Sequence, residues 1–414
     1  MLFIALLSSI VFENARAAPI SPPVEVSPSC TTLSQCRTFE SIVYSCVATL
    51  AACTWVSVHP NIPGPEASSF LIFLFRLKYM IMALIAPELL LTWAIRQWIV
   101  AGRIADKYHE HHGWTRTHGF FLLMGGFALI QDGELVETLS PDRFETFISD
   151  GTITFPTISK DHIEDMSKGD PFSKATAIIT MTWFTVKCFI RMVYKPQPTE
   201  LEVMTFCFTL LSIATYVFWW SKPLHVRYPI FLAKEPGSPS LPYIAEEELG
   251  SWGVMKALVW ISSAMMIVWG EFMDMASGEP MANGDKRVPQ YYDGGVYTSY
   301  DDWASLWHRV PAIAVAFGAL HCFAWNYHFP TTVEQTLWRA SSIISTATPI
   351  LVWLNFYFIE RWSETLHSVV FFLLTLGYGG TRLLLLGIAF SSLRSLSPEA
   401  YQTIGWSTYA PNIQ

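Results

Sequence analysis

Two apolar segments of membrane-spanning length, joined by a turn of a few residues, constrain this chain more than any other feature. The first is ATAIITMTWFTVKCFIRMVY (175–194), and the second is VMTFCFTLLSIATYVFWW (203–220). A helix needs roughly 20 mostly apolar residues to cross the hydrocarbon core of a bilayer. Between the segments, Thr199 and Glu202 form a T-x-x-E capping box, which is typical of a helix start. The pattern predicts a transmembrane helical hairpin.

The far end of this hairpin carries the residues Trp219, Trp220 and Lys222. Tryptophan is enriched at the headgroup level of membranes, and lysine is common just outside it. We therefore expect Lys222 to lie beyond the end of the helix, in contact with headgroups or water.

The composition agrees with a membrane protein. The 414 residues are 51% hydrophobic and only 14% charged, whereas soluble domains carry roughly 25% charged residues. The net charge of −8 argues against a nucleic-acid partner, which requires a basic surface. The expected partner is the lipid bilayer.

The hydrophobic pattern predicts an all-α fold, a polytopic transmembrane bundle of about eight spans with a small polar cap. Residues 119–130 are apolar but cover only about half a bilayer, so they are a ninth span, a re-entrant segment or the end of a tilted helix. The eight predicted spans are 42–58, 70–100, 175–194, 203–220, 252–273, 308–327, 337–358 and 366–390.

The ends and loops complete the predicted organisation. Residues 1–18 resemble a secretory signal peptide with an Ala-Arg-Ala cleavage pattern, although an uncleaved anchor is the alternative. An extended tail is expected over 19–40, followed by a single membrane domain over 41–414. That domain contains polar loops at 131–174 and 274–307, and in the first of them Ser140 and Ser159 are expected helix starts. The predicted location is a membrane of the secretory pathway.

The seven cysteines form two groups. Cys30 and Cys36 lie in the polar tail and are candidates for a disulfide if the tail faces an oxidising compartment. The other five lie in apolar segments, where a free cysteine behaves as a small hydrophobic residue.

Charged residues inside the predicted spans suggest a ligand cavity. Glu88 follows Pro87 within an apolar segment, and a charge near the bilayer centre costs about 2.5–3.5 kcal/mol on insertion scales. Lys187 and Arg191 lie four residues apart on one helical face, which suits an anionic headgroup or carboxylate. The alternatives are that Glu88 only fastens the bundle through an ion pair, and that the two cations extend towards the interface.

A second polar group follows further along the chain. His321 and His328 are seven residues apart, on one face of a helix, with Asn326 between them. They are candidates for a ligand or acid–base role, and hydrogen bonding between helices is the alternative.

The segment HEHHGWTRTH contains four histidines that suggest a weak metal site: His109, His111, His112 and His118. Membrane di-iron oxygenases need three histidine boxes, and this sequence has one. A polar segment at the membrane interface is therefore the favoured interpretation, and no cofactor is expected.

Four motifs resemble a large, uncharacterised family of fungal multi-pass membrane proteins. They are HPNIP (59–63), THGFFLLMGGF (117–127), WWxKPL (219–224) and HCxxWxxxFPTxxE (321–334). The resemblance implies an integral membrane protein. It implies no activity and therefore no catalytic residue.

Two functions follow from these patterns. The first is binding or moving a small molecule, ion or lipid, either lipophilic or anionic, through an intramembrane cavity near Glu88, Lys187, Arg191 and His321. The alternative is a membrane enzyme that acts on a lipophilic metabolite by acid–base chemistry. The sequence contains no Walker A, G-x-S-x-G or H-E-x-x-H motif, which argues against nucleotide-driven pumps and common hydrolases.

Overall fold

The structure is a computed structural model that describes residues 36–65, 67–167, 171–194, 197–238, 270–295, 300–358 and 363–403. The predicted signal peptide, most of the predicted tail and most of the predicted span 252–273 lie outside these ranges. The chain divides into two compact units, which are described separately. Unit 1 comprises Met1–Ser57, Ala175–Ile213 and Pro311–Gln414, and unit 2 comprises Val58–Lys174 and Ala214–Val310.

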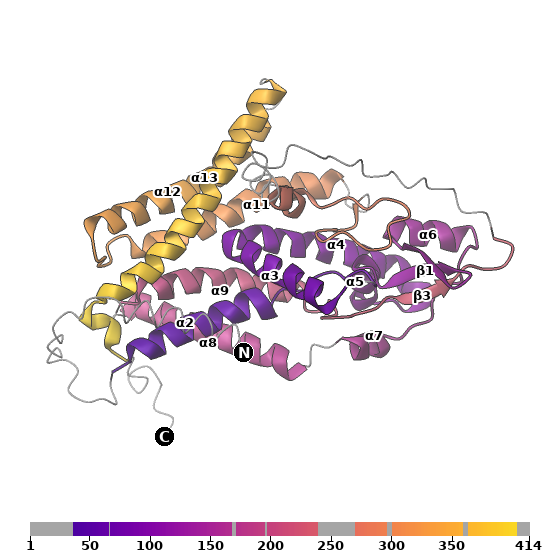
Figure 1. Ribbon diagram of the computed structural model, residues 1–414, viewed down its shortest axis with the longest axis horizontal. Coiled ribbons are helices and arrows are strands. Elements are labelled where there is room, and N and C mark those ends of the chain that lie inside the picture. The colour runs from indigo at the N-terminus through magenta and orange to yellow at the C-terminus, as the bar shows by residue number, and fades with distance from the viewer. Residues whose placement is uncertain are drawn as a thin grey trace. The chain divides into compact units, whose positions relative to one another are not determined.

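Unit 1 is built from long helices, and α12 packs along α13 (Figure 1). A π-helical turn, Ala52–Val56, extends the first helix. The helices that contribute to unit 1 are α2 (Phe39–Ala51), α8 (Pro171–Tyr194), α9 (Glu200–Phe218), α11 (Tyr300–Leu320), α12 (Thr332–Tyr357) and α13 (Glu364–Ser391).

The two helices predicted on either side of the turn, α8 and α9, are present, and so is the capping box. The Glu202 backbone N–H donates to the Thr199 hydroxyl at 3.2 Å, and the Glu202 carboxylate accepts from the Thr199 backbone N–H at 2.9 Å. Thr331 caps α12 in the same way, with a 3.2 Å hydrogen bond from the Glu334 backbone N–H. These caps satisfy N–H groups that have no partner inside their helices.

Four helical segments of the described chain are long and apolar enough to cross a membrane: Phe39–Val56, Lys174–Val193, Glu200–Phe218 and Thr365–Ser395. A fifth is added if the bent pair α3–α4 counts as one span. The protein is therefore mostly helical with several apolar helices suited to a membrane, and the prediction of about eight spans is not confirmed.

In unit 2 the predicted span 70–100 is broken. Helix α3 (Ser69–Ile85) ends before Pro87, and α4 (Pro87–His112) leaves at an angle of 112°. Proline has no N–H for the preceding turn and disfavours helical backbone at the residue before it. Ala86 accordingly has φ −140° and ψ 66°.

The apolar segment 119–130 is also not a continuous helix. Helix α5 (Arg116–Leu123) ends, Gly125 turns the chain at φ +89°, and strand β1 (Phe127–Gln131) follows. The all-α prediction is therefore wrong in this region.

Strand β1 is central in a sheet of order β2-β1-β3. It pairs antiparallel with β2 (Glu134–Thr138) and parallel with β3 (Ile230–Ala233). Figure 1 shows the sheet between the short helices α6 (Pro141–Ser149) and α7 (Lys160–Met166). Ser140 and Ser159 cap these helices, as the sequence predicts.

Helices α4 and α5 approach closely at Gly119. A Cβ atom at this position would lie 2.1 Å from the carbonyl oxygen of Ala101. Only glycine fits there, which gives the first glycine of the THGFFLLMGGF motif a packing role.

Candidate functional site

A buried lysine joins three separate segments of unit 2. The Lys222 side chain is 1% exposed. Its Nζ donates hydrogen bonds to the His59 carbonyl oxygen at 2.6 Å, Asn61 Oδ1 at 3.1 Å and Gln97 Oε1 at 2.8 Å. The three N–H groups of the ammonium therefore have three oxygen acceptors. We call His59, Asn61, Gln97, Trp219 and Lys222 the Lys222 network.

Two indole rings enclose the same ammonium group. Lys222 Nζ lies 4.9 Å from the ring centres of both Trp93 and Trp219. Trp219 also donates from Nε1 to Gln97 Oε1 at 3.0 Å. The expectation that Lys222 lies outside the helix end is thus wrong, because Lys222 and Trp219 are buried whereas Trp220 is 62% exposed.

Two opposing effects act on the pKa of Lys222. Burial lowers its pKa well below the usual range for lysine. The three oxygens are neutral, yet they and the indole faces stabilise the ammonium form. A buried cation held by backbone and amide oxygens depends on exact placement of each partner.

The network positions the segment 289–292. Asn61 Nδ2 donates to the Pro289 carbonyl oxygen at 3.1 Å, and Gln97 Nε2 donates to the Tyr292 carbonyl oxygen at 2.8 Å. The Tyr79 hydroxyl donates to the Gln290 carbonyl oxygen at 3.1 Å. Polar side chains of α3, α4 and the HPNIP loop therefore hold this segment through its backbone.

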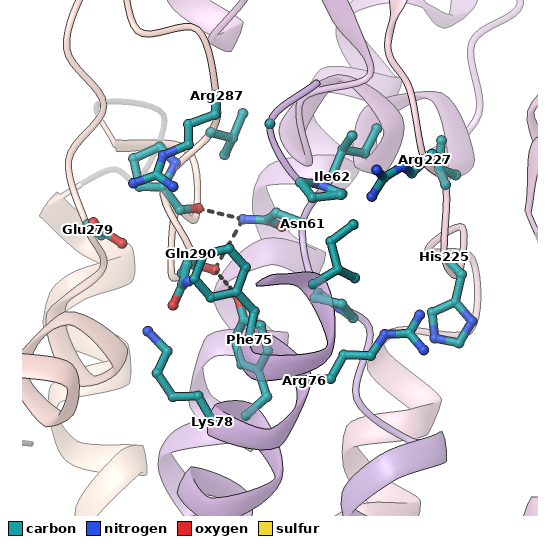
Figure 2. Close-up of a pocket in the computed structure, with 18 of the residues that line it drawn as sticks. Asn61, Ile62, Phe75, Arg76, Lys78, His225, Arg227, Glu279, Arg287 and Gln290 are labelled. Atoms are coloured by element: carbon teal, nitrogen blue, oxygen red, sulfur yellow. Dashed lines mark hydrogen bonds between the residues drawn. The ribbon is translucent and has the colours of Figure 1, made fainter. Parts of the chain in front are cut away.

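A pocket of about 1040 Å³ lies against the network, and Asn61 belongs to both (Figure 2). Its volume is at the upper end of the range for small-molecule sites. It is lined by residues 60–64 of the HPNIP loop, by α3, by the segment 225–228 and by residues between 271 and 290.

One side of the pocket is cationic. Figure 2 shows the Arg76 guanidinium pointing towards His225, with Arg227 further along the same side of the pocket. Arg227 donates to the Ala67 carbonyl oxygen at 2.6 Å. Within the described part of the chain, Arg76 forms no hydrogen bond or ion pair, and its Nε is buried without a partner. Arg76 therefore has unused donors for an anion.

Residues 271–290 contribute the acidic side chains of the pocket. Glu271 pairs with Lys78 at 2.7 Å, and Glu279 accepts from the Tyr291 backbone N–H at 3.4 Å. Burial, together with the nearby Glu279 and Glu271, raises the pKa of Asp274. Mutual repulsion of the carboxylates favours a cation beside them.

Helix α3 has two distinct faces. Ser69, Ile72, Arg76 and Tyr79 line the pocket at helical spacing. Phe70, Phe73, Leu74 and Ile81 are exposed in the structure. An exposed apolar face of this size beside a polar pocket is typical of a membrane-facing helix.

The residues proposed from the sequence lie elsewhere. Glu88 is 2% exposed in the first turn of α4 in unit 2, and Thr92 donates to its carbonyl oxygen at 2.8 Å. Lys187 is half-buried in α8 of unit 1, with Nζ 5.9 Å from the Trp183 ring centre. Neither lines the pocket.

Arg191 and His321 are buried in unit 1 with partners of their own. Arg191 donates to the Gln402 carbonyl oxygen at 2.8 Å and to the Gln197 carbonyl oxygen at 3.1 Å. His321 Nδ1 lies 2.9 Å from the Phe317 carbonyl oxygen, and Nε2 lies 3.2 Å from Met204 Sδ. These contacts fasten chain segments within the unit.

The two remaining candidates of this group, Asn326 and His328, are exposed. Asn326 accepts a 3.4 Å hydrogen bond from Arg339. None of the six candidate side chains belongs to the lining of the pocket.

The four histidines of the HEHHGWTRTH segment are separated by their local contacts. His118 completes the cap of α5 by accepting from the Thr115 backbone N–H at 3.1 Å, and burial lowers its pKa. His112 stacks on Phe155 at 3.5 Å, and His109 Nδ1 lies 3.0 Å from the Trp114 carbonyl oxygen. His111 is exposed. In the ranges that the structure describes, no three His, Cys, Asp or Glu side chains are grouped to hold a metal ion.

The described cysteines are one that is disulfide-bonded and five that are free. Cys36 is disulfide-bonded, and Cys30 lies outside the described residues. Five cysteines are free, and four of them are fully buried: Cys46, Cys53, Cys188 and Cys207, with Cys322 partly buried.

Sequence reasoning missed Lys222, Asn61 and Gln97. A signal for the first two was present, because both lie in motifs, HPNIP and WWxKPL, that contain no catalytic pattern of their own. A polar residue kept between prolines or tryptophans in an apolar chain is a candidate for a buried hydrogen bond.

The fold and pocket define a mostly helical protein with membrane-suited helices, a small sheet and a charged ligand-sized pocket. Residues 7–242 and 305–373 match the model of a family of unknown function, DUF8562, and the chain belongs to that family. No curated protein and no solved structure matches the chain. The matched range includes the Lys222 network, whereas the pocket segment 271–290 falls outside it.

Proposed function

We propose that the protein is a multi-pass membrane protein that binds a small amphipathic molecule, with at least one anionic group, in the pocket of unit 2. The observation that carries this proposal is Arg76. A guanidinium that faces a ligand-sized pocket without a carboxylate partner among the described residues, beside Arg227 and His225, is suited to a phosphate or carboxylate.

The membrane setting supports an amphipathic ligand. The face of α3 opposite Arg76 is apolar and exposed, so an anionic group in the pocket would lie close to hydrocarbon. The disulfide at Cys36 supports a protein of the secretory pathway, because disulfides form in oxidising compartments. On the basis of the four motifs, we also propose that the protein is of fungal origin.

The test compares two charge-removing variants of the full-length protein in detergent. Arg76→Gln removes the unpaired cation of the pocket, and Arg394→Gln removes an exposed cation of unit 1 that pairs with Glu334 at 2.6 Å. Mass spectrometry of co-purified small molecules should show an anionic species that Arg76→Gln loses and Arg394→Gln retains. Equal retention by both variants would contradict the proposal.

A membrane enzyme is the second candidate, and His225 is the observation that favours it. His225 lines the pocket with a backbone φ of 62°, a region that non-glycine residues rarely adopt and that is found at functional sites. If His225 acts as an acid or base, cells that express His225→Gln should differ from cells that express the wild type in their membrane metabolites. The purified His225→Gln protein should still retain the co-purified ligand.

A further inference from the structure

We infer that the ligand is zwitterionic and carries both a phosphodiester and a primary ammonium group, as in a phosphoethanolamine headgroup. This inference rests on the proposed function and names its ligand class. It follows from how charges and unpaired polar atoms are distributed around the pocket.

All four carboxylates of the pocket come from one segment, on a side that also holds Lys78 and Arg287, whereas the opposite side has cations and no carboxylate. Arg76 and the segment 225–228 contribute only cationic or neutral side chains. The segment 271–290 contributes four carboxylates, those of Glu271, Asp274, Glu279 and Asp285, and one cation, Arg287. Figure 2 shows Glu279 and Arg227 on opposite sides. A ligand with one charge of each sign would match both sides.

The carboxylates are not all neutralised by the protein. Lys78 pairs with Glu271 at 2.7 Å. Asp274, Glu279 and Asp285 form no ion pair with any residue in the described ranges. Three carboxylates that line the pocket therefore have no described lysine or arginine paired with them, and an ammonium group of the ligand would supply a partner.

Two unpaired buried atoms support the same orientation. Arg76 Nε is a donor without an acceptor, and Gln290 Oε1 is an acceptor without a donor, among the residues that the structure describes. Buried polar atoms are nearly always hydrogen-bonded. Both side chains line the pocket but these two atoms are covered, so each side chain has to turn for Arg76 to meet a phosphate oxygen and for Gln290 to meet an N–H group of the ligand.

Gln290 Oε1 requires an N–H donor, so it favours ammonium groups that carry hydrogen atoms. A primary ammonium has three donors, whereas a trimethylammonium group has none. Gln290 therefore discriminates ethanolamine from choline. Loss of one hydrogen bond to a charged group predicts roughly 10-fold weaker binding of the choline compound.

The experiment uses the full-length protein in detergent and isothermal titration calorimetry. The probes are sn-glycero-3-phosphoethanolamine, sn-glycero-3-phosphocholine and sn-glycerol 3-phosphate. The first should bind at least about 10-fold more tightly than the other two. Gln290→Leu should remove the preference for ethanolamine over choline, and Arg76→Gln should weaken all three probes, with Arg394→Gln as the control.

The outcomes separate this inference from the proposed function. Equal binding of the ethanolamine and choline probes, with loss in Arg76→Gln, overturns the ammonium inference and leaves an anion pocket. If Arg76→Gln and Arg394→Gln bind the three probes with equal affinity, both the ammonium inference and the proposed function are overturned.

A second arm identifies the source of the headgroup. Native mass spectrometry of protein from nanodiscs containing phosphatidylethanolamine and phosphatidylcholine in equal amounts should show enrichment of the first if a lipid is the ligand. Binding of the water-soluble probe without lipid enrichment would assign the site to a soluble phosphoethanolamine compound.

Discussion

The Lys222 side-chain nitrogen lies 2.6 Å from the carbonyl oxygen of His59, 163 positions away in the sequence. This hydrogen bond joins the HPNIP and WWxKPL motifs in unit 2. The same nitrogen binds Asn61, which lines the pocket. The integrity of the pocket should therefore depend on a lysine that does not line it.

Lys222→Met tests this dependence. The methionine fills similar volume but leaves the His59, Asn61 and Gln97 oxygens without the lysine donor, so we expect the free energy of unfolding to fall by about 3 kcal/mol or more. The measurement is thermal unfolding in detergent. The control is Lys187→Met, since Lys187 is half-buried and lies beside the Trp183 ring; an equal loss in both variants would contradict the role of Lys222.

Two adjacent tryptophans provide a second comparison. Trp219→Phe removes the 3.0 Å hydrogen bond to Gln97 and one aromatic face beside Lys222. We expect a loss of about 1–2 kcal/mol in stability. Trp220 is 62% exposed, so Trp220→Phe should change the unfolding temperature little. The reverse order would mean that the two side chains are placed differently.

The contact between α4 and α5 predicts a strong effect of one methyl group. A Cβ in Gly119→Ala would lie 2.1 Å from the Ala101 carbonyl oxygen, so the helices must separate. Overpacking of this kind costs about 1–3 kcal/mol. At Gly377 of α13, an added Cβ would meet no atom of the described chain within 4 Å, and Gly377→Ala should be neutral or stabilising. Folded yield and unfolding temperature measure the difference.

The two capping-box glutamates of unit 1 differ in burial. The Glu202 side chain is 4% exposed and pairs with Arg37, whereas the Glu334 side chain is 13% exposed and pairs with Arg394, which is 58% exposed. Glu202→Gln should cost about 3 kcal/mol because it leaves the partly buried Arg37 without its counter-charge. Glu334→Gln should cost about 1 kcal/mol or less. Chemical unfolding of both variants tests the order.

We expect the affinity of the pocket for its ligand to depend on pH through the carboxylate of Asp274. Its pKa is raised, so its carboxylate gains a proton at a higher pH than usual. The ammonium of sn-glycero-3-phosphoethanolamine is held only by the charged form. Affinity should therefore be highest at neutral pH and fall as pH drops through the raised pKa.

The groups near Asp274 sharpen this test. Glu279, Glu271 and Lys78 act on its charge, and His225 is the titratable side chain on the cationic side of the pocket. Asp274→Asn should weaken binding at neutral pH and reduce the fall on acidification. A wild-type affinity that is constant or rises between about pH 7 and about pH 4 would contradict the role of Asp274.

Features set by neighbours in the sequence were predictable. The caps at Thr199 and Thr331 need only a hydroxyl and a carboxylate three residues apart, and the helix starts at Ser140 and Ser159 are equally local. The apolar length of α8 and α9 follows from composition within each segment. Such features depend on a few adjacent residues, so the sequence by itself determined them.

The remaining features depend on partners far along the chain. Strand β1 pairs with its sequence neighbour β2, but its other edge is completed only in the folded protein by β3, about 100 residues later. Pro87 marks a helix break in the sequence, but only the structure gives its angle of 112°. Lys222 follows two tryptophans in a pattern typical of a membrane interface, and only the tertiary structure surrounds it with His59, Asn61 and Gln97. The physical reason is that a charge is placed by whichever oxygens can replace its water, and those oxygens come from segments that meet only in the folded protein.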